Sequence, residues 1–232
     1  MIHIYCIRTD AQNVSATLLE SRVASVIATL PASKYHRIQH IRPSQGRINS
    51  ALGWCLLQFA LHDRGYADFT LSQLRFDGNR KPRWPNARCD FNLSHAGLLV
   101  ACAVTDAGRI GIDCEHIRPV NAAALMRRIL ATNERTPPGA DVPAFFRLWT
   151  QKEAVIKAEG NGGVWEMSRV LVDGTTADYQ GARWYLYPIT CGGDYVAHVA
   201  SDIADQSITM HAVSIEQLLG DGGNRDQSAS MD

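Results

Sequence analysis

The chain has 232 residues, 46% of them hydrophobic and 20% charged, which is ordinary for a globular protein with a core. Its 23 basic residues balance its 23 acidic residues, so the formal net charge is zero, which argues against a dedicated nucleic-acid binder. No apolar stretch approaches the roughly 18 residues of a membrane span. The length suits one large domain or two small ones.

The six cysteines are scattered, with no C-x-x-C pair of the kind found at structural zinc sites. Arg8 and Asp10 interrupt the first apolar run too early for the hydrophobic region of a signal peptide. We therefore expect a soluble cytoplasmic protein, with no membrane and no nucleic acid among its partners.

The first half of the chain alternates strand and helix patterns. Residues 2–8 alternate as a strand does, and residues 13–30 form an amphipathic helix stopped by Pro31. Pro43 suits the first turn of a longer helix that Gly65 closes.

Two further strands are predicted around a turn. Residues 98–105 are nearly all apolar, as in a strand buried on both faces. Residues 106–108 have turn chemistry, and residues 109–115 return as a second strand.

The second half repeats this scheme. Residues 121–134 and 141–160 are predicted helices, the second with Asp141 as N-cap and Gly160 at its end. The remaining strand candidates are residues 170–172, 184–189, 195–200 and 207–214. A glycine-glycine hairpin turn joins the strands at residues 184–189 and 195–200. Residues 221–232, mostly polar, are expected to be a disordered tail.

Two acidic motifs lie about forty positions apart. The first, G-I-D-C-E at residues 111–115, places Asp113 and Glu115 on one face of a strand. On a mostly buried strand, two such acids need a cation or a partner, although acids at the end of an edge strand are common.

The second motif, W-T-Q-K-E-A-V-I-K, places Trp149, Lys152, Glu153 and Lys157 on one side of a helix. A glutamate–lysine pair at this spacing is usually surface support, but a solvated face seldom carries tryptophan. Three carboxylates beside ammonium groups suit Mg²⁺ holding a polyphosphate. Either Lys152 or Lys157 could neutralise that phosphate.

The segment F-N-L-S-H at residues 91–95 contains a serine followed by a histidine. Ser94 and His95 could be a nucleophile and its base, or His95 could be a core histidine. No G-x-S-x-G elbow surrounds the serine, and neighbours in a strand point in opposite directions, so we reject the nucleophile.

With these motifs and the upstream R-K-P at residues 80–82, the sequence resembles the two-domain, Sfp-type 4′-phosphopantetheinyl transferases. Ala154, which follows Glu153, matches the subgroup with W-x-x-K-E-A. The resemblance implies an α/β (α+β) fold made of a pseudo-twofold pair of similar subdomains. We expect an N-terminal half at residues 1–106 and a C-terminal half at residues 107–220.

The resemblance implies a magnesium-dependent enzyme that transfers the phosphopantetheine arm of coenzyme A to a serine of an apo carrier protein. It implies that Asp113, Glu115 and Glu153 hold Mg²⁺, for which Mn²⁺ could substitute. Glu153 or a metal-bound water would deprotonate the serine, and Lys157 would stabilise the pyrophosphate.

The remaining expected coenzyme A contacts come from the same resemblance. They are Arg47, Lys81, Pro82, Ser94 and His95. For the 3′-phosphate, Arg47 is preferred over Arg37 and Arg42, and Arg80 stands where relatives often have glycine.

The expected partners are acyl, peptidyl or aryl carrier proteins, docking near the helix at residues 121–134, and the chain is expected to be a monomer. The alternatives are a metal-dependent phosphohydrolase that uses the same acids and a coenzyme A binding protein without catalysis. The intact Glu153 argues against the latter, and the lack of a second acidic cluster argues against a two-metal hydrolase.

Overall fold

A computed structural model describes most of the chain: residues 1–9, 16–41, 44–76, 81–85, 87–132, 134 and 141–219. The predicted tail at residues 221–232, the start of the first predicted helix and Arg42 lie outside these described residues. Among the described helices, none combines the length and the apolar character that crossing a membrane requires.

The first sheet has four strands in the order β2-β3-β1-β9. Its strands are β1 (Ile2–Arg8), β2 (Asp90–Ala96), β3 (Leu99–Thr105) and β9 (Ile208–Ala212). All neighbours are antiparallel except β1 and β9, which are parallel. A segment from beyond residue 107 therefore returns to the first sheet, while the division of the chain into two domains stays a prediction.

The second sheet has five antiparallel strands in the order β4-β8-β7-β6-β5. Its strands are β4 (Ile110–His116), β5 (Leu171–Asp173), β6 (Thr176–Tyr179), β7 (Ala182–Ile189) and β8 (Tyr195–Ser201).

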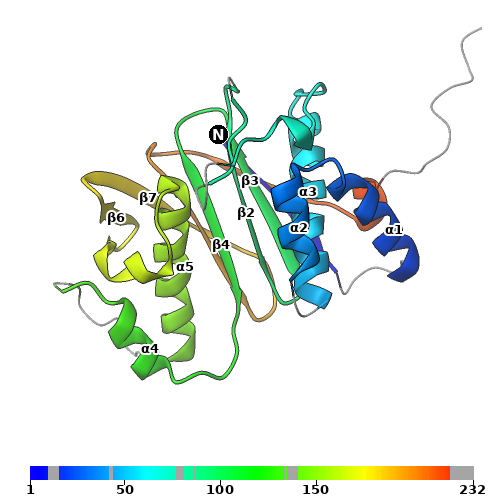
Figure 1. Cartoon of the computed structure of the whole chain (residues 1–232). Helices are drawn as coiled ribbons and strands as arrows, with labels where there is room; N and C mark the ends of the chain where they lie inside the picture. Colours follow the sequence, from blue (N-terminus) through cyan, green and yellow to red (C-terminus); the bar gives the residue numbers. More distant parts are fainter. Residues whose placement is uncertain are drawn as a thin grey trace, which may run out of the picture.

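Helices cover one face of each sheet (Figure 1). The helices are α1 (Ala16–Ile27), α2 (Ala32–Gln39), α3 (Ser44–Asp63), α4 (Ala122–Ile129), α5 (Val142–Glu159) and α6 (Ile215–Leu219), with short 3-10 helices η1 (Leu71–Gln73) and η2 (Val164–Arg169). Helix α3 packs on β3 and β2, and α5 packs on β4 and β8. The predicted α/β class is confirmed.

Three apolar clusters hold these layers together. One lies between α1, α3 and the first sheet, and a second lies between α5 and the second sheet. The third, which includes Ile4, Ala101, Ile112 and Val199, joins the faces of the two sheets that carry no helix. The burial of these apolar faces supplies most of the driving force for the arrangement.

Several sequence predictions are confirmed in detail. Every residue of β3 is buried, as its unbroken apolar run predicted. Asp141 caps α5 by accepting a hydrogen bond from the Ala144 amide at 2.8 Å. Gly160 ends that helix in the left-handed conformation, with a φ of 87°.

Other predictions need correction. The helix predicted at residues 121–134 ends at Ile129, where the chain turns to an extended conformation at Leu130. Helix α2 was not predicted, because it is short and mostly polar and therefore shows no apolar stripe. Among its residues whose burial is described, Ile38 is the one that is buried. Strands β2 and β6 were also missed.

Helix α5 approaches β4 unusually closely at Gly111. A Cβ atom at this position would lie 2.0 Å from the carbonyl oxygen of Ala154 and 2.5 Å from the amide nitrogen of Ala158. Only glycine allows backbone to approach backbone in this way. The glycine of the first motif therefore sets the distance between Asp113 on β4 and the polar side chains of α5.

Candidate active site

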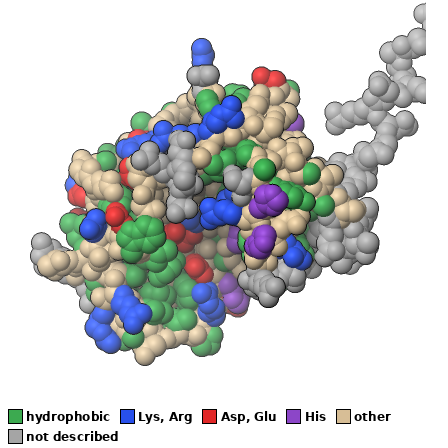
Figure 2. Space-filling view, in the orientation of Figure 1, with side chains coloured by type: hydrophobic (Ala, Val, Ile, Leu, Met, Phe, Trp, Pro, Cys, Tyr) green, Lys and Arg blue, Asp and Glu red, His purple; other side chains and the backbone are tan. Residues whose placement is uncertain are grey.

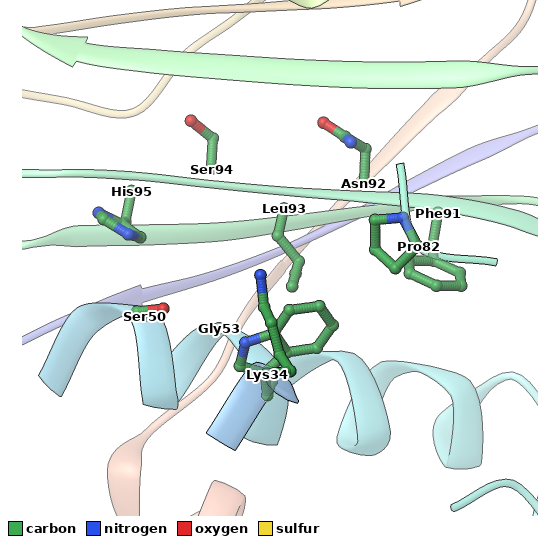
Figure 3. Close-up of a pocket in the computed structure, with 10 residues that line it drawn as sticks. Lys34, Ser50, Gly53, Pro82, Phe91, Asn92, Leu93, Ser94 and His95 are labelled. Atoms are coloured by element: carbon green, nitrogen blue, oxygen red, sulfur yellow. The ribbon is translucent and has the colours of Figure 1, made fainter. Parts of the chain in front are cut away.

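A cleft lies between the two helix-covered halves, over the adjoining strands β2 and β4. Two pockets open into it, with volumes of about 210 and 240 Å³, and both are lined by Lys34, Pro82 and Asn92. The first pocket, drawn in Figure 3, continues to Ser94 and His95. The second continues along α5. Figure 2 shows acidic, basic and histidine side chains gathered in this hollow.

Strands β2 and β4 are edges of different sheets, and side chains join them where backbone pairing is absent. Asp90, Asn92 and Ser94 share one face of β2 and reach toward β4. Their side-chain oxygens accept hydrogen bonds from the amides of Ile110, Ile112 and Cys114, at 2.8, 3.0 and 3.2 Å. This ladder fixes the register between the two sheets at the floor of the cleft.

Lys157 from α5 meets Asp113 and Ser94 on this floor. Its ammonium nitrogen donates to Asp113 Oδ1 at 2.7 Å and to Ser94 Oγ at 3.1 Å, and Ser94 donates to the same carboxylate oxygen at 3.0 Å. Burial disfavours the charge on Lys157, but Asp113 and Glu153 outweigh it and raise the pKa of the ammonium group. Lys157 therefore stays charged. A quarter of its side chain is exposed, on the side of the cleft.

Two carboxylates, Asp113 and Glu153, act on this lysine, and Glu115 acts on Glu153. Burial raises the pKa of Glu153; Lys157 lowers it, while Asp113 and Glu115 raise it further by repulsion. One oxygen each of Asp113 (Oδ2) and Glu153 (Oε2) is buried and has no hydrogen-bond partner among the described residues. Glu115 instead pairs with Arg118 at 2.9 Å.

Two orphaned, mutually repelling carboxylate oxygens fit a hard cation such as Mg²⁺. Within the described part of the chain, however, no three His, Cys, Asp or Glu side chains are already grouped as a metal site. The donor chemistry fits the expected metal, and the assignment of its three ligands remains a prediction.

His95 projects from the opposite face of β2, toward α3 and away from Ser94 (Figure 3). Burial and the nearby positive charge of Lys157 lower the pKa of its imidazole, while Asp113 acts in the other direction. Ser94 and His95, although adjacent in the sequence, thus contact different parts of the structure. Ser94 is engaged between the sheets, and His95 lines the pocket.

Lys81 is held at the edge of the cleft. Its ammonium group pairs with Asp90 and donates to the carbonyl oxygen of Ile110 at 2.6 Å, and its amide bonds to the Gly160 carbonyl at 3.1 Å. The side chain is only 7% exposed. Lys81 therefore braces β2, β4 and the end of α5, while Pro82 faces both pockets.

Arg47 does not join the other predicted residues. It lines a separate pocket between α1, α2 and α3. Among the described residues of the chain, Lys34 and Arg37 of α2 are cations that line the cleft on this side. Lys34, which sequence reasoning missed, lies 5.0 Å above the Trp54 ring, and its pKa is lowered by burial and by Arg37.

Lys152, the other lysine of the second motif, lies outside the cleft. Its ammonium group is fully buried, pairs with Glu134 and donates to the carbonyl oxygens of Met167 and Val170. Glu134 also accepts from the Val172 amide at 3.1 Å. This cluster ties α5 to η2 and β5, so Lys157 is the lysine of this motif that faces the cleft.

The fold and cleft define an α/β protein with carboxylates beside basic groups, an arrangement suited to a polyphosphate. Residues 109–200 match the model of the 4′-phosphopantetheinyl transferase superfamily. This segment of the chain is therefore similar to that superfamily, whereas membership of the whole chain and its placement in the Sfp-type subgroup stay predictions.

Curated proteins with similar sequences are named 4′-phosphopantetheinyl transferases. A 155-residue segment, 62% of this chain and 65% of the relative, is 32% identical to the 4′-phosphopantetheinyl transferase HetI of Nostoc sp.. The transferase AcpT of Salmonella typhi is 40% identical over 37% of this chain and 46% of its own length. The transferase psf-1 of Bacillus pumilus is 37% identical over 48% of this chain and 49% of its own length. The similarity thus spans about half to two thirds of these relatives.

Proposed function

We propose that the chain transfers the 4′-phosphopantetheine group of coenzyme A to a serine of an apo carrier protein, with Mg²⁺ as its cofactor. The observation that carries this proposal is the pairing of Lys157 with Asp113 beside two orphaned carboxylate oxygens, Asp113 Oδ2 and Glu153 Oε2. The match of residues 109–200 to the transferase superfamily supports the same reaction.

We propose that coenzyme A lies along the cleft. We propose that the pyrophosphate lies near Lys157 and His95 and that the 3′-phosphate lies toward Lys34 and Arg37, which line the adjoining pockets. Because Arg47 lies in another pocket, it is not part of this proposed site. Lys81 and Ser94 would act by holding β2 against β4, and Pro82 would contact the substrate.

Asp113, Glu115 and Glu153 would hold the metal. When bound, Mg²⁺ would offset the negative charge of the pyrophosphate oxygens. Glu115 would have to exchange its surface pairing with Arg118 for this role, which costs little because exposed ion pairs are weak.

Chain residues would perform the rest of the reaction. Glu153, whose pKa is raised by burial, would accept the proton of the carrier serine hydroxyl as its oxygen attacks the phosphorus that bears pantetheine. Adenosine 3′,5′-bisphosphate would leave, and the ammonium of Lys157 would stabilise its developing charge. Otherwise the protein contributes mainly by positioning the reactants.

The carrier would dock near α4, where Arg127 and Arg128 form the basic last turn. Both strands that carry the site belong to one chain, which supports a working monomer. Acyl, peptidyl and aryl carrier proteins remain the candidate partners.

The direct test incubates the protein with coenzyme A, Mg²⁺ and an apo acyl carrier protein and weighs the carrier by intact mass spectrometry. A gain equal to one phosphopantetheine group supports the transferase. Free adenosine 3′,5′-bisphosphate with an unmodified carrier would instead identify a phosphohydrolase, and binding of coenzyme A without either product would identify a non-catalytic binder.

A further inference from the structure

The turn that follows His95, residues 96–98, is held by side chains from α3 and from β8. On one side, the Asn49 side-chain amide of α3 donates to the carbonyl oxygen of Gly97 at 2.7 Å. On the other side, the amide of Leu98 donates to the phenol oxygen of Tyr195, the first residue of β8, at 2.9 Å. These two hydrogen bonds therefore fix the turn to α3 and to β8.

Both holding groups are themselves fixed. Asn49 is 2% exposed, and its side-chain oxygen accepts from Gln45 one helical turn earlier at 2.8 Å. The Tyr195 ring packs beside the His116 ring at 4.9 Å, and the Arg8 guanidinium lies 4.9 Å from its centre. A hydrogen bond to a group that is already immobilised loses little entropy and positions its partner well.

Gly97 is shaped for this contact. Its φ is +53°, in the left-handed region, and a Cβ atom there would lie 2.6 Å from the Tyr195 phenol oxygen. Glycine is the residue that meets both the conformation and the close approach. The turn and Tyr195 are therefore built for each other.

We propose that Tyr195 is a positioning residue that holds the His95 imidazole in the cleft through the turn at residues 96–98. The inference rests on the proposed function, in which His95 contacts a coenzyme A phosphate. Tyr195 lines neither cleft pocket, so it acts through the turn and not by touching the substrate. Asn49 holds the same turn from the α3 side.

The test substitutes Tyr195→Phe, which removes the phenol oxygen and leaves the ring packing. Calorimetry with coenzyme A should show affinity about 3- to 10-fold weaker, the usual net effect of one hydrogen bond. Turnover at saturating coenzyme A should stay near the wild-type value, so KM rises while kcat does not fall. Unchanged affinity and KM would overturn the proposal.

Tyr187→Phe is a matched control. Tyr187 lies in the neighbouring strand β7, where its phenol oxygen donates to the Ile203 carbonyl at 3.1 Å and accepts from the Gln206 amide at 3.2 Å. The chemical change is the same, but these bonds lie outside the cleft. This variant should bind coenzyme A as the wild type does, and an equal loss in both variants would contradict a specific role of Tyr195.

A double-mutant cycle asks whether Tyr195 acts through His95. In the His95→Ala background, Tyr195→Phe should have no further effect on coenzyme A affinity. An equal additional loss there would overturn the proposal.

One readout separates the failure of this inference from failure of the proposed function. The pKa of His95, followed by nuclear magnetic resonance without coenzyme A, should rise toward its ordinary value in Tyr195→Phe, because the loosened imidazole moves away from the positive charge of Lys157. It should not move in Tyr187→Phe. If the wild type bound no coenzyme A, the proposed function would fail, and this titration would still decide the role of Tyr195.

Discussion

The two lysines of one helical motif, Lys152 and Lys157, show how differently two regions of α5 are used. Lys152 is fully buried and pairs with Glu134, which is itself 4% exposed. The hydrogen bonds of the Lys152 ammonium group therefore stabilise the packing of α5. Lys157 is a quarter exposed, and its partner Asp113 keeps one oxygen without a partner among the described residues. A satisfied buried pair stabilises a fold, whereas an incompletely satisfied pair in a cleft is available for a ligand.

The largest expected effect tests the structural lysine. Lys152→Ala would leave the Glu134 carboxylate buried without its cation, which costs about 3–5 kcal/mol of unfolding free energy. Urea unfolding followed by circular dichroism measures this loss. The double variant Lys152→Met with Glu134→Gln should regain part of it, since no unpaired charge stays buried; wild-type stability in Lys152→Ala would show that the cluster is not structural.

The second prediction concerns the lysine in the cleft. Lys157→Ala should lower the rate of carrier modification about 10²- to 10³-fold, the usual effect of removing one group that stabilises transition-state charge. Its unfolding free energy should fall by less than that of Lys152→Ala, because Lys157 is a quarter exposed and water can reach the charge that its loss leaves unpaired. A rate within twofold of the wild type would remove Lys157 from the mechanism.

The third prediction uses pH to probe the packing region of α5. His198 is buried and hydrogen-bonded to Thr150 at 2.8 Å, and burial, with a smaller effect of Arg147, lowers its pKa to about 4. The unfolded chain takes up this proton near pH 6.5 and the folded chain only near pH 4. The stability from neutral His198 is therefore present above pH 6.5 and lost as the pH falls through this window.

The expected loss from this group between pH 7 and pH 4 is about 3 kcal/mol, taken from the pKa difference. His198→Gln removes the titrating group and should show a correspondingly shallower decline in denaturant unfolding. Parallel pH profiles for the variant and the wild type would mean that His198 is charged or exposed in the folded protein.

The smallest expected effect compares two cations on the α2–α3 side. Lys34→Ala should weaken coenzyme A binding about 5-fold, which corresponds to one partly exposed charge contact. Arg47→Ala is the matched control and should leave the affinity unchanged, because Arg47 lines a different pocket. The reverse ranking in calorimetry would show that the cleft ends elsewhere and that the sequence-based preference for Arg47 was sound.

Local signals explain which elements could be predicted. The caps of α5 at Asp141 and Gly160 depend on side chains within one turn of the helix, so the sequence alone located them. The unbroken apolar run of β3 reported burial on both faces in the same way. Helix α2 and strand β2 carry mixed polar residues whose roles depend on distant partners, and local patterns did not reveal them.

By itself, the sequence determined the order of motifs, the α/β class and the similarity of residues 109–200 to the transferase superfamily, because these depend on residue types and spacing along the chain. The tertiary structure alone showed that Lys157 faces the cleft and Lys152 does not, that Lys34 and Arg47 line different pockets, and that Lys81 bonds to β2 and β4. The physical reason is that burial and charge pairing are set by groups far apart in sequence. Neither the Ser94 ladder to β4 nor the Tyr195 contact with the turn after His95 has any local signature.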